Sequence, residues 1–137
     1  MTEGQHDIQK APGYNVVKAQ AMKFDTEKIP TELFSVPAYL GVCRVLQFGA
    51  KKYAAWNWSK GLLYMRVYAA TLRHLMAWAT GEDNDQETGL SHIDHAMCEL
   101  MFLSHFVKHP EYKALDDRPY KSVSTTPSGG YSPVPEM

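Results

Sequence analysis

The chain has 137 residues, of which 45% are hydrophobic and 21% are charged, and its formal net charge is −1. This length suits one domain of ordinary size, and the composition is that of a globular protein. A nearly neutral chain has no overall basic field for duplex nucleic acid, so we expect no nucleic-acid partner. No apolar run is long enough for a membrane span, so no membrane partner is expected either.

The two ends of the chain differ in composition from its middle. Residues 1–22 are mixed and polar, and we predict a flexible arm there. Residues 110–137 end in STTPSGGYSPVPEM, which is too rich in Ser, Thr, Pro and Gly to build a core, so we predict a largely disordered tail. The folded domain is therefore expected at residues 23–109.

The start of the chain and its two cysteines indicate in which cellular compartment the protein is found. The start, MTEGQHDIQK, has no hydrophobic signal core. Cys43 and Cys98 lie far apart in apolar helical contexts, which is typical of buried thiols in a reducing compartment. We expect a cytoplasmic protein.

The first predicted helix covers residues 36–50. Ser35 is a suitable N-cap, and Pro37 is tolerated in the first turn of a helix. Gly49 falls near the expected end, where a left-handed C-cap residue is common. A basic and aromatic connection, KKYAAWNWSKG, follows.

Two further helices are predicted at residues 62–80 and 90–108. The helix at 62–80 is apolar on nearly every side, which in a small domain indicates a subunit interface. The helix at 90–108 carries His92, His95 and Glu99 on one stripe. No segment shows the alternation of a strand, so the expected fold is an all-α bundle whose core hairpin is completed by oligomerisation.

Acids and histidines gather where these two helices meet. GEDNDQETG, residues 81–89, has turn chemistry, in which Gly81 can close one helix and Gly89 accepts unusual dihedral angles. A short turn makes the helices antiparallel neighbours, so His74 should face the start of the next helix. Imidazole and carboxylate bind Mn²⁺, Zn²⁺ or, with more oxygens, Mg²⁺. The predicted metal ligands are His74, Glu82, Asp85, Glu87, His92 and His95.

Three other interpretations of this segment remain open. A solvated acidic turn is the simplest. An EF-hand calcium loop would need glycine at its sixth position and glutamate at its twelfth, where Thr88 and Asp94 stand. A histidine–aspartate phosphohydrolase needs a His-Asp dipeptide, which here occurs only as His6-Asp7.

The basic and aromatic connection is a candidate phosphate and base site. Lysine binds phosphate as a point charge, and an indole or phenol face can stack on a base. Alternatively, this segment is a surface turn anchored by a buried tryptophan. The predicted substrate-binding residues are Lys51, Lys52, Asn57, Trp58 and Lys60, with Tyr53 and Trp56 interleaved among them.

Four ordered segments together resemble a known family. KFDTEKIP, FGAKKYAAWNWSKG, LRHLMAWATGED and HIDHAMCELMFL, within residues 23–108, are similar to the phage dATP/dGTP diphosphohydrolase-like proteins. That group is related to the all-α MazG nucleoside triphosphate pyrophosphohydrolases and occurs in phages that substitute 2-aminoadenine for adenine. The resemblance would place the protein in the host cytoplasm.

The resemblance implies an oligomeric enzyme, a dimer or a tetramer. It would convert a (deoxy)nucleoside triphosphate, with a purine favoured and dGTP first, to the monophosphate and pyrophosphate. Two or three Mg²⁺ or Mn²⁺ ions are implied, and Co²⁺ or Zn²⁺ is also compatible. MazG-type carboxylate positions fall here on Thr71, His74, His92 and His95, so we hypothesise that the loop acids supply the missing negative charge.

On this basis we predict three catalytic residues, Glu87, His95 and Arg73. Glu87 or His95 would accept a proton, and Arg73 would stabilise phosphate charge. Two other functions remain open. They are a triphosphohydrolase of the histidine–aspartate type and a non-catalytic helical phage module stabilised by metal.

Overall fold

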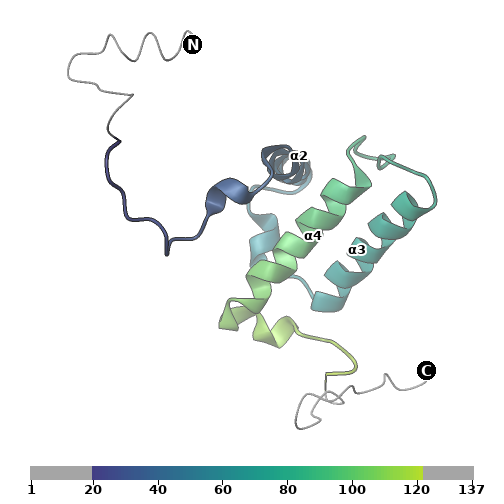
Figure 1. The fold of residues 1–137 in the computed structure, drawn as a ribbon. Coiled ribbons are helices and arrows are strands. Elements are labelled where there is room, and N and C mark those ends of the chain that lie inside the picture. Colours follow the sequence, from purple (N-terminus) through teal and green to yellow (C-terminus); the bar gives the residue numbers. More distant parts are fainter. Residues whose placement is uncertain (1–19, 122–137) are drawn as a thin grey trace. The chain divides into compact units, whose positions relative to one another are not determined.

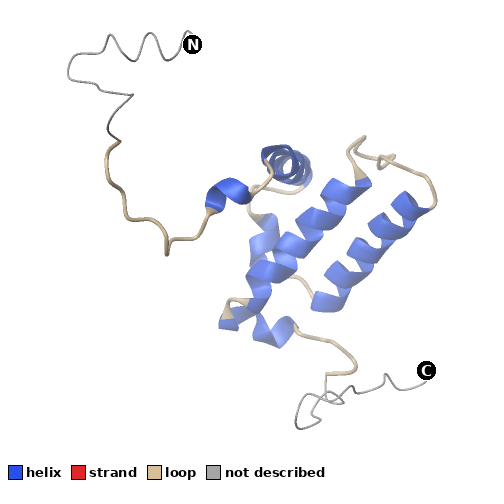
Figure 2. Ribbon diagram, in the orientation of Figure 1, coloured by secondary structure: helices blue, strands red, loops and turns tan. Residues whose placement is uncertain are grey.

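The computed structural model describes residues 20–121. Residues 20–33 belong to a unit of their own, which holds one short 3₁₀ helix, η1 (Thr31–Leu33). The second unit starts at Phe34 and contains α2 (Val36–Lys52), η2 (Asn57–Lys60), α3 (Tyr64–Ala79), α4 (His92–Val107) and η3 (Pro110–Leu115) (Figure 1). Residues 20–121 contain no strand, only one isolated bridge between Asn84 and Ser91, so the all-α prediction is confirmed (Figure 2). Most of the predicted arm lies outside the described residues.

Helix α2 begins as its sequence predicts but ends later. The Ser35 hydroxyl accepts a hydrogen bond from the backbone N–H of Ala38 at 3.2 Å, which confirms the N-cap. The predicted C-cap at Gly49 is wrong, because the helix continues to Lys52. Gly49 keeps its carbonyl in the helix and accepts from the N–H of Tyr53 at 2.9 Å. The left-handed residue of this connection is Trp56 instead.

Helices α3 and α4 form an antiparallel hairpin, and α2 packs on α4 (Figure 1). The close approach of α2 to α4 needs the small residue Gly41, which is buried. A Cβ atom at this position would clash with the carboxylate of Asp94 on α4. One helix of the hairpin, α4, is therefore covered by two neighbours.

The main core lies where α3 begins and α4 ends. Tyr64, Val67 and Phe106 are buried together, and the rings of Tyr64 and Phe106 stack with 6.0 Å between centroids. Trp58 packs on Phe102 at 4.9 Å, which ties η2 to α4. The opposite end of the hairpin, which carries the acidic loop, lies outside this core and holds polar groups.

The chain stays ordered beyond residue 109, where the sequence predicted a tail. Tyr112 and Leu115 of η3 pack against the core. The Tyr112 hydroxyl donates to the Ser59 carbonyl at 2.6 Å, and Asp117 accepts from the backbone N–H of Met65 at 2.9 Å. Two apolar side chains and two hydrogen bonds therefore dock this polar segment on the core. The predicted disorder of residues 122–137 lies outside the described residues.

The outer side of α3 is apolar and uncovered in the single chain. Its exposed large residues are Tyr68, Leu72, Leu75, Met76 and Trp78. An interface between copies would cover them, and oligomerisation stays a prediction. No helix among the described residues is both long and apolar enough to cross a membrane.

Candidate functional site

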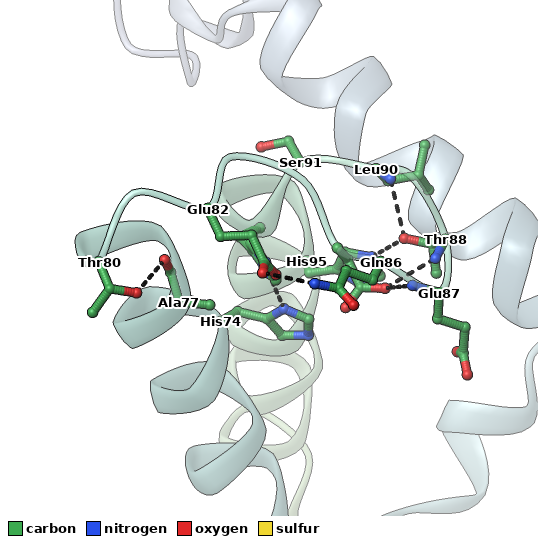
Figure 3. Close-up of polar contacts among 12 residues, drawn as sticks. His74, Ala77, Thr80, Glu82, Gln86, Glu87, Thr88, Leu90, Ser91 and His95 are labelled. Atoms are coloured by element: carbon green, nitrogen blue, oxygen red, sulfur yellow. Dashed lines mark hydrogen bonds and ion pairs between the residues drawn. The ribbon is translucent and has the colours of Figure 1, made fainter.

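The loop between α3 and α4 is a tight and well-bonded turn (Figure 3). Gly81 and Gly89 have φ angles of +103° and +71°, as their predicted turn roles require. The Asp85 carboxylate accepts hydrogen bonds from the backbone N–H groups of Glu87 and Thr88, each at 2.9 Å. These two hydrogen bonds fix the orientation of the Asp85 carboxylate.

Three imidazoles meet beneath this loop. The Nδ1 atoms of His74 and His92 are 2.9 Å apart, and the rings of His74 and His95 stack at 4.5 Å. His92 is buried, and its Nε2 lies 2.6 Å from a Glu82 carboxylate oxygen. His95 Nε2 lies 2.7 Å from the Thr88 hydroxyl. The prediction that the three histidines converge across the hairpin is therefore confirmed.

The contact with Glu82 indicates which nitrogen of His92 carries a proton. A carboxylate can only accept, so we assign the proton to Nε2 of His92. In the neutral ring, Nδ1 of His92 is then a lone-pair atom that can accept from Nδ1–H of His74. A carboxylate that orients an imidazole in this way is the usual outer partner of a metal-binding histidine. Glu82, predicted as a ligand, makes this kind of contact with His92.

Burial and hydrogen bonding set the charges of the cluster. Burial, together with the neighbouring imidazoles, lowers the pKa of His74 below its ordinary value. Burial likewise lowers the pKa of His95, although Asp85 opposes this. Partial burial would raise the pKa of Asp85, but the N–H groups of Thr88 and Glu87 outweigh it, and that pKa is lowered. His74 and His95 are thus held neutral and Asp85 anionic at pH 7, the forms in which these groups bind metal.

Three of these residues could hold one metal ion. His74, Asp85 and His92 each offer a ligand atom, and the three atoms lie within 4.8 Å of one another. Ligand distances of about 2.0–2.2 Å separate opposite ligands by about 4 Å, so a small side-chain movement would close this set on an ion. Two imidazole nitrogens and one carboxylate oxygen suit Mn²⁺ or Zn²⁺ better than Mg²⁺, which prefers oxygen. The residues present therefore fit a divalent cation.

The other predicted ligands have different partners. Glu87 is exposed and pairs with Lys52 at 3.1 Å. His95 contacts Thr88, as described above. Thr71, which the resemblance placed at a carboxylate position, is buried and donates to the Val67 carbonyl at 2.8 Å.

A groove of about 1120 Å³ runs from this cluster to the aromatic connection. It joins α2, η2, the hairpin loop and the inner faces of α3 and α4. The predicted site residues that line it are Lys52, Asn57, Trp58, Arg73, His74, Asp85, Glu87 and His95. The predicted residues Lys51, Lys60, Glu82 and His92 are not among its lining. The acidic, histidine-rich hairpin loop and the basic, aromatic connection therefore line the same groove.

Residues 18–118 match the family model described as dATP/dGTP diphosphohydrolase, N-terminal. The chain belongs to this family. A relative described as a dATP/dGTP diphosphohydrolase, from Salmonella phage PMBT28, is 40% identical over 82 residues. The match covers 60% of this chain and 28% of the relative, so the chain spans well under a third of that phage protein's length. No solved structure matches this dATP/dGTP diphosphohydrolase-family chain.

Two groove residues of this family member, Glu99 and Trp56, were not among the predicted catalytic, metal-binding or substrate-binding residues. Glu99 lines the groove one turn beyond His95, and burial raises its pKa to about 7 although Arg73 opposes the shift. Its position on the stripe with His92 and His95 was visible in the sequence, but its burial was not. Trp56 also lines the groove and is 71% exposed. Local sequence gave no way to decide which tryptophan of the connection is buried and which is free.

Proposed function

We propose that this domain hydrolyses a purine (deoxy)nucleoside triphosphate, with dGTP or dATP favoured, to the monophosphate and pyrophosphate with the help of a divalent metal. The observation that carries the proposal is the single groove that joins a His–Asp–His cluster to cationic and aromatic side chains. The family description and the name of the phage relative support the same chemistry and the same two bases. Removing these nucleotides would alter the precursor pool of a phage, including one that uses 2-aminoadenine.

The cationic side chains of the groove would hold the phosphates. Lys52 is bound to Glu87 by a surface ion pair, with side-chain exposures of 44% and 63%. Such a pair stabilises by at most about 1 kcal/mol, so a phosphate can replace Glu87 as the partner of Lys52. Arg73 lies in the same groove, on the turn of α3 that carries His74. Asn57 would contact the sugar.

The reaction needs a water to attack the α-phosphorus and the bond to the pyrophosphate oxygen to break. A divalent cation held by His74, Asp85 and His92 would supply charge neutralisation and polarise the phosphoryl group. Glu87, once released by Lys52, can accept the proton of the attacking water. Arg73 and Lys52 stabilise the charge that develops on the leaving pyrophosphate.

His95 is also available as a proton acceptor, because burial keeps it neutral at pH 7. The Thr88 hydroxyl accepts from the N–H of Leu90 at 3.1 Å, so its own hydrogen is free to point at His95 Nε2. His95 must leave Thr88 before it can take a proton from water. Glu87 must likewise leave Lys52, but that ion pair is exposed and a phosphate can replace it, so we assign Glu87 the first role.

The direct test separates the products of each NTP and dNTP with Mg²⁺, Mn²⁺ or Co²⁺. Monophosphate and pyrophosphate from dGTP or dATP are expected. Nucleoside and tripolyphosphate would instead indicate a triphosphohydrolase of the histidine–aspartate type. A metal-dependent rise in melting temperature without any product would indicate a non-catalytic helical module.

Two neighbouring loop acids provide a matched pair of variants. Asp85→Asn should abolish turnover and the stabilisation by Mn²⁺, because it removes the only carboxylate of the His–Asp–His cluster. Asp83→Asn changes an exposed side chain of the same loop and should leave both unchanged.

Glu87→Gln should lose turnover and keep the Mn²⁺ stabilisation. Full turnover in Glu87→Gln would rule out its catalytic role.

A further inference from the structure

Trp56 has an unusual backbone conformation and an exposed side chain. Its φ and ψ angles are 64° and 14°, in the left-handed region, and it is the only non-glycine residue with positive φ among residues 20–121. A bulky side chain is disfavoured there, and such strained residues gather at functional sites. The residue is 71% exposed, so burial in the core does not explain the presence of an indole here.

The strained turn is firmly held. The carbonyl of Trp56 accepts from the hydroxyl and the backbone N–H of Ser59, at 2.6 and 3.0 Å. Ser59 is in turn bound through its own carbonyl to the hydroxyl of Tyr112 in η3. The position of Trp56 is therefore set by the core before any ligand arrives.

The neighbouring tryptophan has a different environment. Trp58 stacks on Phe102, with 4.9 Å between ring centroids and 18° between planes, and also contacts Phe106 and His105. Trp56 adjoins Trp58 at 5.9 Å, with the planes tilted by 38°. The rings thus form a row that starts in the core at Phe102 and ends at the exposed indole of Trp56.

The row meets α4 at Phe102, away from the histidines at the start of that helix. On α4, Phe102 is seven residues from His95, which corresponds to about 10 Å along the helix axis. A nucleoside triphosphate extends over a similar length from its base to its phosphates. Lys52, which is suited to phosphate, and Asn57, which is suited to a hydroxyl, line the groove.

We infer that Trp56 is the base-stacking residue of this groove, with the purine on its indole and the phosphates at the His74–Asp85–His92 end. The inference rests on the proposed function and adds the specificity residue and the direction of the nucleotide. Trp58 is then the support of Trp56 and not the direct partner of the base. A stack on an indole accepts any base and favours the larger purine rings.

Calorimetric titration of the whole chain with two probes in Mn²⁺ tests this inference. One probe is the α,β-methylene analogue of dGTP, whose α–β bridge resists hydrolysis. The other is inorganic tripolyphosphate, which has no base. Trp56→Leu should weaken binding of the analogue by about 5- to 150-fold, the effect of one base stack, and change tripolyphosphate binding by less than about twofold.

Two further variants serve as controls. Trp56→Phe keeps an aromatic face and should retain most of the affinity for the analogue. Trp78→Leu removes an indole that is 50% exposed on α3, outside the groove, and should bind both probes as the wild type does.

Two results would overturn the role of Trp56 and leave the proposed function intact. They are wild-type affinity of Trp56→Leu for the analogue, and equal weakening of both probes, which would show a structural effect on the whole groove. A wild-type protein that binds neither probe and hydrolyses no nucleotide would overturn the proposed function itself.

Discussion

Replacing Glu99 by glutamine should stabilise the protein at alkaline pH and not at acidic pH. Glu99 is half-buried, lines the groove and forms no side-chain hydrogen bond within residues 20–121. Burial raises its pKa from 4.5 to about 7, and the charge of Arg73 only partly offsets this. The ionised form is therefore the disfavoured one in the folded protein.

The sign and size of the effect follow from the two pKa values. Because the folded pKa is the higher one, the stabilising contribution of Glu99 is complete below about pH 4.5 and is lost as pH rises through about 7. A shift of this size corresponds to about 3 kcal/mol at 1.36 kcal/mol per unit. Solvent in the open groove screens part of it, so we expect about 1–2 kcal/mol between pH 5 and pH 8.

Urea unfolding of the metal-free protein at pH 5 and pH 8 measures this difference. The free energy of unfolding of Glu99→Gln, relative to wild type, should rise by about 1–2 kcal/mol between the two pH values. Glu111→Gln, a change at an exposed carboxylate of η3, should show no such rise. The other titratable side chains are the same in both proteins, so the comparison isolates the substituted carboxylate. A difference that stays constant from pH 5 to pH 8 would refute the argument from burial.

Three further predictions concern the metal cluster, the core and a helix cap. Mn²⁺ at 100 times its Kd should stabilise the wild type by about 2.7 kcal/mol in a thermal-shift assay, and Asp85→Asn should lose this effect. The stabilisation should persist as pH falls to about 6.5, because burial lowers the pKa of His74 and delays competition by protons. Phe106→Ala should lower the free energy of urea unfolding by about 3–5 kcal/mol, since Phe106 is fully buried; a loss below about 1 kcal/mol would contradict its place in the core. Ser91→Ala should lower it by about 1 kcal/mol, because its hydroxyl accepts from the N–H groups of Ile93 and Asp94 at the start of α4.

Helix positions were predictable from local chemistry, and helix ends less so. The Ser35 cap and Pro37 located the start of α2, yet Gly49 did not end it. A glycine permits a left-handed C-cap but does not impose one. Here the backbone hydrogen bonds of α2 continue past Gly49, whose carbonyl accepts from the N–H of Tyr53. Residues 110–117 were predicted as part of a tail because the composition of the whole segment is polar. Composition does not show that two single side chains, Tyr112 and Leu115, pack against the core.

The amino-acid sequence alone determined the all-α class, the α3–α4 hairpin and the meeting of His74, His92 and His95, because periodicity and a short turn leave few arrangements open. Only the tertiary structure decided the role of each side chain. It placed Glu82 behind His92, joined Lys52 to Glu87, buried Glu99 and left Trp56 exposed while Trp58 packed on Phe102. These outcomes depend on contacts between residues distant in the chain, since burial and hydrogen-bond partners arise only when the helices pack.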